Sequence, residues 1–201
     1  MKAHHPGTVS SDEQAFQQIS SRFQDEVGSI LSRVDFVRGP VPFWALIRTM
    51  FPIAESLGDL IYRKDQATAQ NLCSILKNEF ESVRPGYAAK AAILALLYRH
   101  SLTHHDELRI IVSGMKQVGW KVSSADDTNH LQVRAASHDL FIIEFQPRAF
   151  YADIIKVCGH ALTRSWSGKV MARYNRWMLF DLEVVSRNST VKAAKNELAL
   201  L

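Results

Sequence analysis

Apolar residues recur at three- and four-residue steps through most of the first hundred residues, and this spacing constrains the fold more than any other feature. The first such stripe follows Ser10-Ser11 and two acidic residues, which together are typical of a helix start. Its members are Phe16, Ile19, Phe23, Val27, Ile30 and Val34. The spacing predicts an amphipathic helix that ends near Gly39-Pro40.

Three more helices are expected before residue 100. Pro42 is suited to open the second, which Pro52 should kink, and Asp65 to cap the third. The fourth follows Arg84-Pro85-Gly86, and its segment Ala88 to Leu97 is apolar nearly all round. That composition is typical of a central, buried helix. Four helices joined by short connections predict an antiparallel bundle.

The pattern changes after Gly119, where three short segments have the composition of strands. They are Trp120 to Val122, His130 to Val133 and Leu140 to Phe145, with a turn at Ser137-His138-Asp139. We expect a small antiparallel hairpin or sheet around 120–145. Pro147 should then start a helix that runs through Leu162, and a last helix is expected from about Lys169 to Val185. The chain is interpreted as a single domain of 1–201: bundle 10–118, β insertion 119–146, closing helices 147–186 and tail 187–201.

Composition narrows the class of protein. The chain has 201 residues, 47% of them hydrophobic, and two cysteines, Cys73 and Cys158, at no metal-binding spacing. Its longest apolar stretch, Ala91 to Tyr98, is too short to span a membrane, and the N-terminus lacks a signal-peptide core. We therefore expect a cytoplasmic protein with reduced thiols, no metal, no cofactor and no membrane partner.

The sharpest chemical signature is Tyr98-Arg99-His100-Ser101-Leu102-Thr103-His104-His105. Core helices rarely end in an arginine and three histidines, because burying such groups is costly unless they are paired. The segment resembles the motif of the HEPN superfamily, a helical-bundle family in which Arg is followed by four to six residues and then His. The common form reads Arg-Asn-x-Leu-x-His, often after Tyr; here His100 replaces the Asn. The resemblance covers roughly residues 10 to 115.

Many HEPN proteins are metal-independent endoribonucleases, and the resemblance implies that activity here. In that reaction the ribose 2′-OH attacks the adjacent phosphate and leaves a 2′,3′-cyclic phosphate. Histidine titrates near neutrality, so His104 is assigned acid/base work. Arg99 is assigned phosphate stabilisation, because its guanidinium stays charged and forks toward phosphate oxygens. His100 would orient the phosphate or the 2′-OH, and His105 is the alternative register of the motif.

Helix geometry adds a constraint on this site. Positions five apart differ by roughly 140° around a straight helix, so Arg99 and His104 do not share a face. Either the helix distorts near Thr103, or two subunits form one site. The usual HEPN arrangement is a dimer with both motifs lining one cleft, so we expect a homodimer. A defence or toxin-type ribonuclease with a cognate inhibitor protein fits this reading. The alternative is a non-catalytic HEPN-like module that binds nucleotide, RNA or protein.

Other polar groups admit further readings. His100 and His104 lie four apart and share a face, as in some zinc sites, but no third ligand stands at a recognisable spacing. Glu55 and Asp59, one turn apart, suit either helix pairing or orientation of a catalytic side chain.

The last quarter of the chain is basic. Residues 151 to 201 carry 8 Lys and Arg against 4 Asp and Glu. Four cations and three aromatics between Arg164 and Trp177 are suited to bind RNA phosphates and bases, or to form a solvated helix face over a packed aromatic core. The predicted RNA-binding residues are Arg164, Lys169, Arg173 and Arg176.

Overall fold

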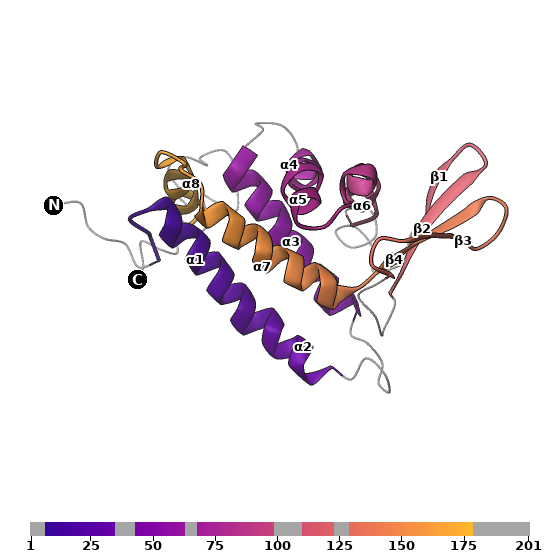
Figure 1. The fold of residues 1–201 in the computed structure, drawn as a ribbon, viewed down its shortest axis with the longest axis horizontal. Coiled ribbons are helices and arrows are strands. Elements are labelled where there is room, and N and C mark those ends of the chain that lie inside the picture. Colours follow the sequence, from indigo (N-terminus) through magenta and orange to yellow (C-terminus); the bar gives the residue numbers. More distant parts are fainter. Residues whose placement is uncertain (1–6, 35–42, 63–67, 99–109, 123–128, 179–201) are drawn as a thin grey trace, which may run out of the picture. The chain divides into compact units, whose positions relative to one another are not determined.

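The computed structural model describes residues 7–34, 43–62, 68–98, 110–122 and 129–178. These residues form mostly helices, together with one small sheet (Figure 1). The prediction of a mainly helical fold is confirmed. None of the described helices combines the length and the apolarity that a membrane span requires. The helices are α1 (Asp12–Phe23), α2 (Ser29–Arg33), α3 (Phe43–Tyr62), α4 (Thr68–Ile75), α5 (Glu81–Val83), α6 (Ala91–Tyr98), α7 (Pro147–Leu162) and α8 (Lys169–Met178).

The chain divides into two compact units, Met1–Ala15 with Trp166–Leu201, and Phe16–Ser165. In the smaller unit, hydrogen bonds join the N-terminal segment to α8 and to the turn that precedes it. The carboxylate of Asp12 accepts hydrogen bonds from the backbone N–H groups of Gly168, at 2.7 Å, and Met171, at 2.6 Å. An acidic side chain from far away in sequence therefore caps the positive end of α8.

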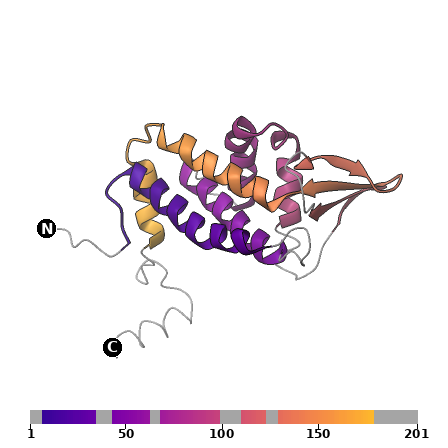
Figure 2. The ribbon, with the colours of Figure 1, turned by 60° about the horizontal axis from the view of Figure 1, so that its bottom comes forward.

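The centre of the larger unit is α3. Its inward side chains have no solvent exposure and include Leu46, Ile47, Met50, Phe51, Ala54, Leu57 and Leu60. α4 and α7 both pack against α3, and α7 runs along it in both ribbon views (Figures 1 and 2). α4 approaches α3 closely at Gly58, where a Cβ atom would lie 2.4 Å from the backbone oxygen of Asn71. Only glycine allows the two helices to meet at this distance.

A π-helical segment, Gln24–Gly28, joins α1 to α2. A π turn adds one residue to the helical repeat and shifts the phase of everything after it. The buried residue in α2 is accordingly Leu31, which is 6% exposed, whereas the predicted Ile30 is half-buried. Gly28, the last residue of the π turn, leaves room for the hydroxyl of Tyr151 on α7.

The fourth predicted helix is less central than its composition indicates. A 3-10 turn, Ala88–Lys90, leads into α6, and α6 packs against α4 and the sheet. Leu96 on α6 is 42% exposed and Ala92 is exposed as well. The prediction of a helix buried all round is therefore wrong for one face of α6.

The sheet has four strands in the order β1-β2-β4-β3. They are β1 (Ile111–Ser113), β2 (Lys116–Val122), β3 (Val133–Ala135) and β4 (Leu140–Phe145). The predicted hairpin between β3 and β4 is present, but the sheet is mixed rather than antiparallel, because β2 and β4 pair in parallel. β1 was not predicted; it forms a hairpin with β2 through Gly114-Met115, where Gly114 has a φ of 60°. A glycine at the first position of such a two-residue turn supplies the positive φ that the turn requires.

Candidate functional site

The predicted catalytic residues Arg99, His100, His104 and His105 lie outside the described residues. The structure does describe the helix that leads to them. α6 ends at Tyr98, which is 4% exposed and stacks on Phe51 with ring centroids 4.9 Å apart. The chain is thus anchored in the core directly before Arg99.

Tyr98 belongs to an aromatic cluster centred on Phe51. The Phe51 ring also lies 4.8 Å from that of Phe150, 5.6 Å from that of Phe145 and 5.8 Å from that of Trp120. These rings come from α7, β4 and β2, so the cluster joins two strands of the sheet, α3 and α7 to the end of α6. Aromatic pairs at such distances add to the stability that burial alone provides.

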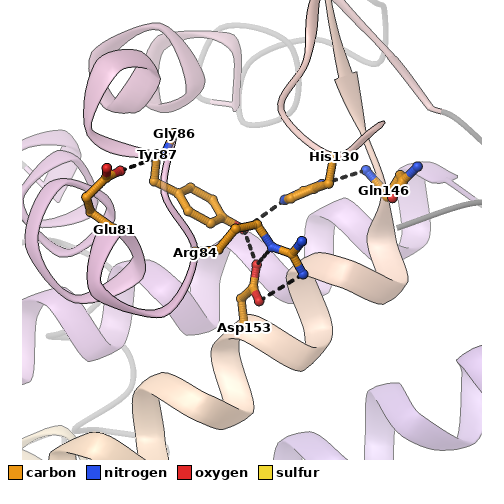
Figure 3. Close-up of polar contacts among 7 residues, drawn as sticks. All are labelled: Glu81, Arg84, Gly86, Tyr87, His130, Gln146 and Asp153. Atoms are coloured by element: carbon orange, nitrogen blue, oxygen red, sulfur yellow. Dashed lines mark hydrogen bonds and ion pairs between the residues drawn. The ribbon is translucent and has the colours of Figure 1, made fainter. Parts of the chain in front are cut away.

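A buried polar network adjoins this cluster (Figure 3). Its centre is Asp153 on α7, which has no solvent exposure. Arg84 binds both carboxylate oxygens, with Nε 2.7 Å from Oδ2 and Nη2 3.3 Å from Oδ1. The Tyr87 hydroxyl donates a third hydrogen bond, 3.0 Å long, to Oδ2. The buried charge is therefore both paired and hydrogen-bonded, as a carboxylate in the core must be.

A short turn supplies two of these partners. Arg84 and Tyr87 flank Pro85-Gly86, and Gly86 has a φ of 110°. The Glu81 carboxylate closes the turn by accepting a hydrogen bond from the backbone N–H of Gly86, 2.9 Å away (Figure 3). It accepts another from the backbone N–H of Ala88, 2.7 Å away. The segment Arg84-Pro85-Gly86, which predicts a helix boundary in the sequence, thus also positions Arg84 and Tyr87 in the network.

His130 extends the network to the sheet. Its Nδ1 accepts a hydrogen bond from the backbone N–H of Gln146, 3.0 Å away, so the proton of the neutral ring resides on Nε2. Nε2 then donates to the Tyr87 hydroxyl oxygen, 2.8 Å away, and that hydroxyl donates onward to Asp153. Burial, with a smaller contribution from the Arg84 charge, lowers the pKa of His130 from 6.5 to about 3.

The contacts of this network and the shifted pKa values of its members both favour a structural role over a catalytic one. Burial and the neighbouring Asp153 raise the pKa of Tyr87 well above 10, while His130 stays neutral far below pH 7. Groups this far from neutrality are poorly matched to acid/base catalysis at physiological pH. The network instead fixes the turn before α6, the sheet and α7 to one another.

A second cluster engages one predicted RNA-binding residue. Arg164 binds both oxygens of Glu79, with Nη1 2.9 Å from Oε1 and Nη2 2.7 Å from Oε2. The Glu79 side chain is only 8% exposed, and Tyr62 also donates to it. The bond to Glu79 raises the pKa of Arg164 above its ordinary value. Arg164, which follows the end of α7, thus stabilises the buried carboxylate of Glu79 in the π-helical segment Leu76–Phe80.

The other three predicted RNA-binding residues lie on α8, in the smaller unit. Lys169 and Arg176 are exposed and Arg173 is half-buried. Of the aromatic residues on α8, Tyr174 is 8% exposed and packs in the core, while Trp177 is 39% exposed. The helix is therefore amphipathic, and Lys169, Arg176 and Trp177 are exposed at its surface.

The zinc alternative rests on His100 and His104, which lie outside the described residues, and would need further ligands from elsewhere in the chain. Both ring nitrogens of His130 are hydrogen-bonded, His138 binds Asp139, and His160 is exposed. Within the described ranges, no group of three His, Cys, Asp or Glu residues is placed to hold a metal ion. Asp59 accepts a hydrogen bond from Asn71 on α4, 3.1 Å away, which is the helix-pairing role.

Comparison of the chain with family models, curated proteins and solved structures finds no match. The resemblance to the HEPN superfamily therefore stays a prediction. The sequence analysis did not predict the buried network, although the position of Asp153 indicates it. Asp153 lies four residues from both Ala149 and Val157, so it falls on the apolar face of its helix, where a charged residue requires a partner.

Proposed function

We propose that this protein is a metal-independent endoribonuclease in which Arg99 and His104 act on RNA. The observation that supports the proposal most directly is that Tyr98, the residue before Arg99, is buried and stacks on Phe51. The motif therefore follows directly after a residue that is held in the core. Pre-positioned acid/base and cationic groups are what phosphoryl transfer to a 2′-OH requires. His104 accepts or returns the proton, Arg99 neutralises charge on the phosphorane, and His100 orients the phosphate.

The active form in this proposal is a homodimer. Two copies of Arg99 and His104 meet at one groove, which resolves the 140° offset between them on a straight helix. One histidine accepts the proton of the 2′-OH while its mate protonates the leaving 5′-oxygen. A toxin or defence role with a cognate inhibitor protein follows from the same resemblance.

The test is cleavage of single-stranded RNA by the pure protein in excess EDTA, with detection of 2′,3′-cyclic phosphate ends. Arg99→Ala and His104→Ala should each lower the rate by at least about a hundredfold. His160→Ala is the matched control, because this histidine is exposed on α7. Circular dichroism checks that each variant stays folded. Damage from His105→Ala with a silent His104→Ala would move the site to the other register, and activity restored only by zinc would contradict the proposal.

RNA binding is proposed to use the cations of α8. Replacement of Lys169, Arg173 and Arg176 by Ser should lower the slope of log K against log salt by about 2, since each phosphate contact on a single strand contributes about 0.7. Fluorescence anisotropy over a salt series measures this slope. An unchanged slope would show that α8 is an ordinary solvated helix.

A non-catalytic binding module is the second candidate, and a specific observation favours it. The β1–β2 hairpin exposes large apolar side chains, with Met115 at 79% and Val112 at 63% exposure. Exposed apolar groups gathered in one place are typical of protein-binding surfaces. Tight RNA binding or dimer formation, without cleavage under any condition, would support this candidate.

A further inference from the structure

The open edge of β1 concentrates exposed apolar side chains. Ile110 is 46% exposed, Val112 63% and Met115 79%, and Leu96 on the adjoining α6 is 42% exposed. β1 and β3 are the two edges of the sheet, and among the described residues no strand pairs with the outer side of β1. A neutral, apolar edge of this kind is a template for another strand.

The register shows which backbone groups face outward. Ser113 and Lys116 close the two-residue turn, so they form the hydrogen-bonded pair of the hairpin. The next pair, Val112 and Gln117, is by alternation the pair without mutual hydrogen bonds. The N–H and C=O of Val112 therefore point to the open edge, where they can bond another strand.

Apolar side chains also gather around Gly119 on one side of the hairpin, a side that carries Gln117 and Lys121 as well. Ile110, Val112 and Ile142 lie on the face opposite Trp120 and Phe145, which contact the helices. A Cβ at Gly119 would lie 3.6 Å from Ile110 and 3.5 Å from Ile142, so these two side chains converge over the glycine. Pairing at the β1 edge would extend this surface and cover Val112.

We propose that the occupant of the β1 edge is a second copy of this chain, paired antiparallel about a two-fold axis at Val112. Each Val112 then exchanges two hydrogen bonds with its mate, and Ile111 lies opposite Ser113 of the second copy. The two sheets become one continuous eight-stranded sheet.

Charge favours self-pairing at this edge. The segment 110–115 has no charged residue, so no like charges meet across the axis. Among the described residues of the hairpin, the cations are Lys116 and Lys121, both on β2, and the two β2 strands would be three strand spacings apart. At about 4.8 Å per spacing, that is about 14 Å, beyond the screening length of about 8 Å at physiological salt. By contrast, β3 carries Arg134, whose guanidinium pairs with Glu144.

This pairing deepens the dimer of the proposed function, and rests on it only for the expectation that two copies associate. α6, whose last residue precedes Arg99, packs against β1, so a contact at β1 joins the elements next to the motif. The pairing itself depends on described residues alone. Its failure would show in the oligomeric state, whereas failure of the nuclease proposal would show in the RNA cleavage of Arg99 and His104 variants.

The test is sedimentation of the full chain over a concentration series. Val112→Lys should weaken self-association by about a hundredfold or more, because it removes two apolar contacts and places two cations across the axis. Val133→Lys is the matched control: it makes the same change at a 49% exposed valine on the other edge. A strictly monomeric wild type at micromolar concentration, or equal loss of association in both variants, would overturn the proposal.

A second variant keeps the test independent of any folding defect in the lysine protein. Hydrogen-bonded antiparallel pairs have Cα atoms about 5.5 Å apart, within the range of a disulfide. In a Cys73→Ser background, Val112→Cys should therefore form an interchain disulfide under mild oxidation, and Val133→Cys should not. A monomeric Val112→Cys on a non-reducing gel, with its thiol free, would refute pairing at this residue.

Discussion

The state of His130 makes the stability of this protein depend on pH in a calculable way. In the unfolded chain its pKa is near 6.5, and in the folded protein it is about 3. Because the folded form disfavours the proton, His130 contributes stability that is complete above pH 6.5 and declines as pH falls toward 3. Within this window one proton is taken up on unfolding, so the free energy of unfolding falls by about 1.4 kcal/mol per pH unit. Between pH 7.5 and pH 5 the loss from this residue alone should be about 2 kcal/mol.

Urea unfolding followed by circular dichroism at pH 7.5, 6.5, 5.75 and 5 measures this loss. His130→Gln should be less stable at neutral pH, since it disrupts two buried hydrogen bonds, but its free energy of unfolding should vary less with pH. His160→Gln removes an exposed histidine and should keep the wild-type slope. If His130→Gln and wild type show parallel pH profiles, the neutral, buried state assigned to His130 is wrong.

Three further predictions use the same unfolding assay. Tyr87→Phe removes the hydroxyl that bridges the histidine and the aspartate, and should destabilise the protein by about 2–4 kcal/mol; a loss under about 1 kcal/mol would contradict the bridge. Gly58→Ala should cost at least about 2 kcal/mol because two helix backbones meet there, whereas Gly159→Ala, with no atom within 4 Å of the new Cβ, should gain up to about 1 kcal/mol. Equal effects at the two glycines would refute the close approach. Arg164→Ala strands a buried glutamate and should cost about 1–2 kcal/mol, while the exposed Arg176→Ala should stay within about 0.5 kcal/mol.

Local signals predicted part of the fold well. Pro147 begins α7 and the helix ends at Leu162, as expected, because proline at the first helical position and an apolar stripe are both encoded nearby. The turn at Ser137-His138-Asp139 likewise gave the β3–β4 hairpin. Such elements are specified by residues within a few positions of each other.

What the sequence did not predict depends on distant pairing. The parallel alignment of β2 with β4 follows from how the sheet packs on the helices, and alternation within each strand carries no information on strand order. In the buried network, Tyr87 bonds to His130, 43 positions later in the sequence, and to Asp153, 66 positions later. The phase shift before Leu31 needed a π turn that no residue type marks. The Arg99–His104 motif was found by resemblance, and its geometry lies outside the described residues.

The Asp12 cap on α8 has a consequence for the order in which the protein is made. Asp12 and its partner Met171 are 159 residues apart, and Val9 and Asn175 are 166 apart. At roughly 5–20 residues per second, a ribosome needs roughly 8–30 s to synthesise the chain between the first pair. During that time Phe16–Ser165 is synthesised, so the helices and strands that precede α7 can begin to pack before α8 exists. The N-terminal segment is therefore synthesised before the rest of the chain, but its hydrogen bonds to α8 can form only after α8 has been synthesised.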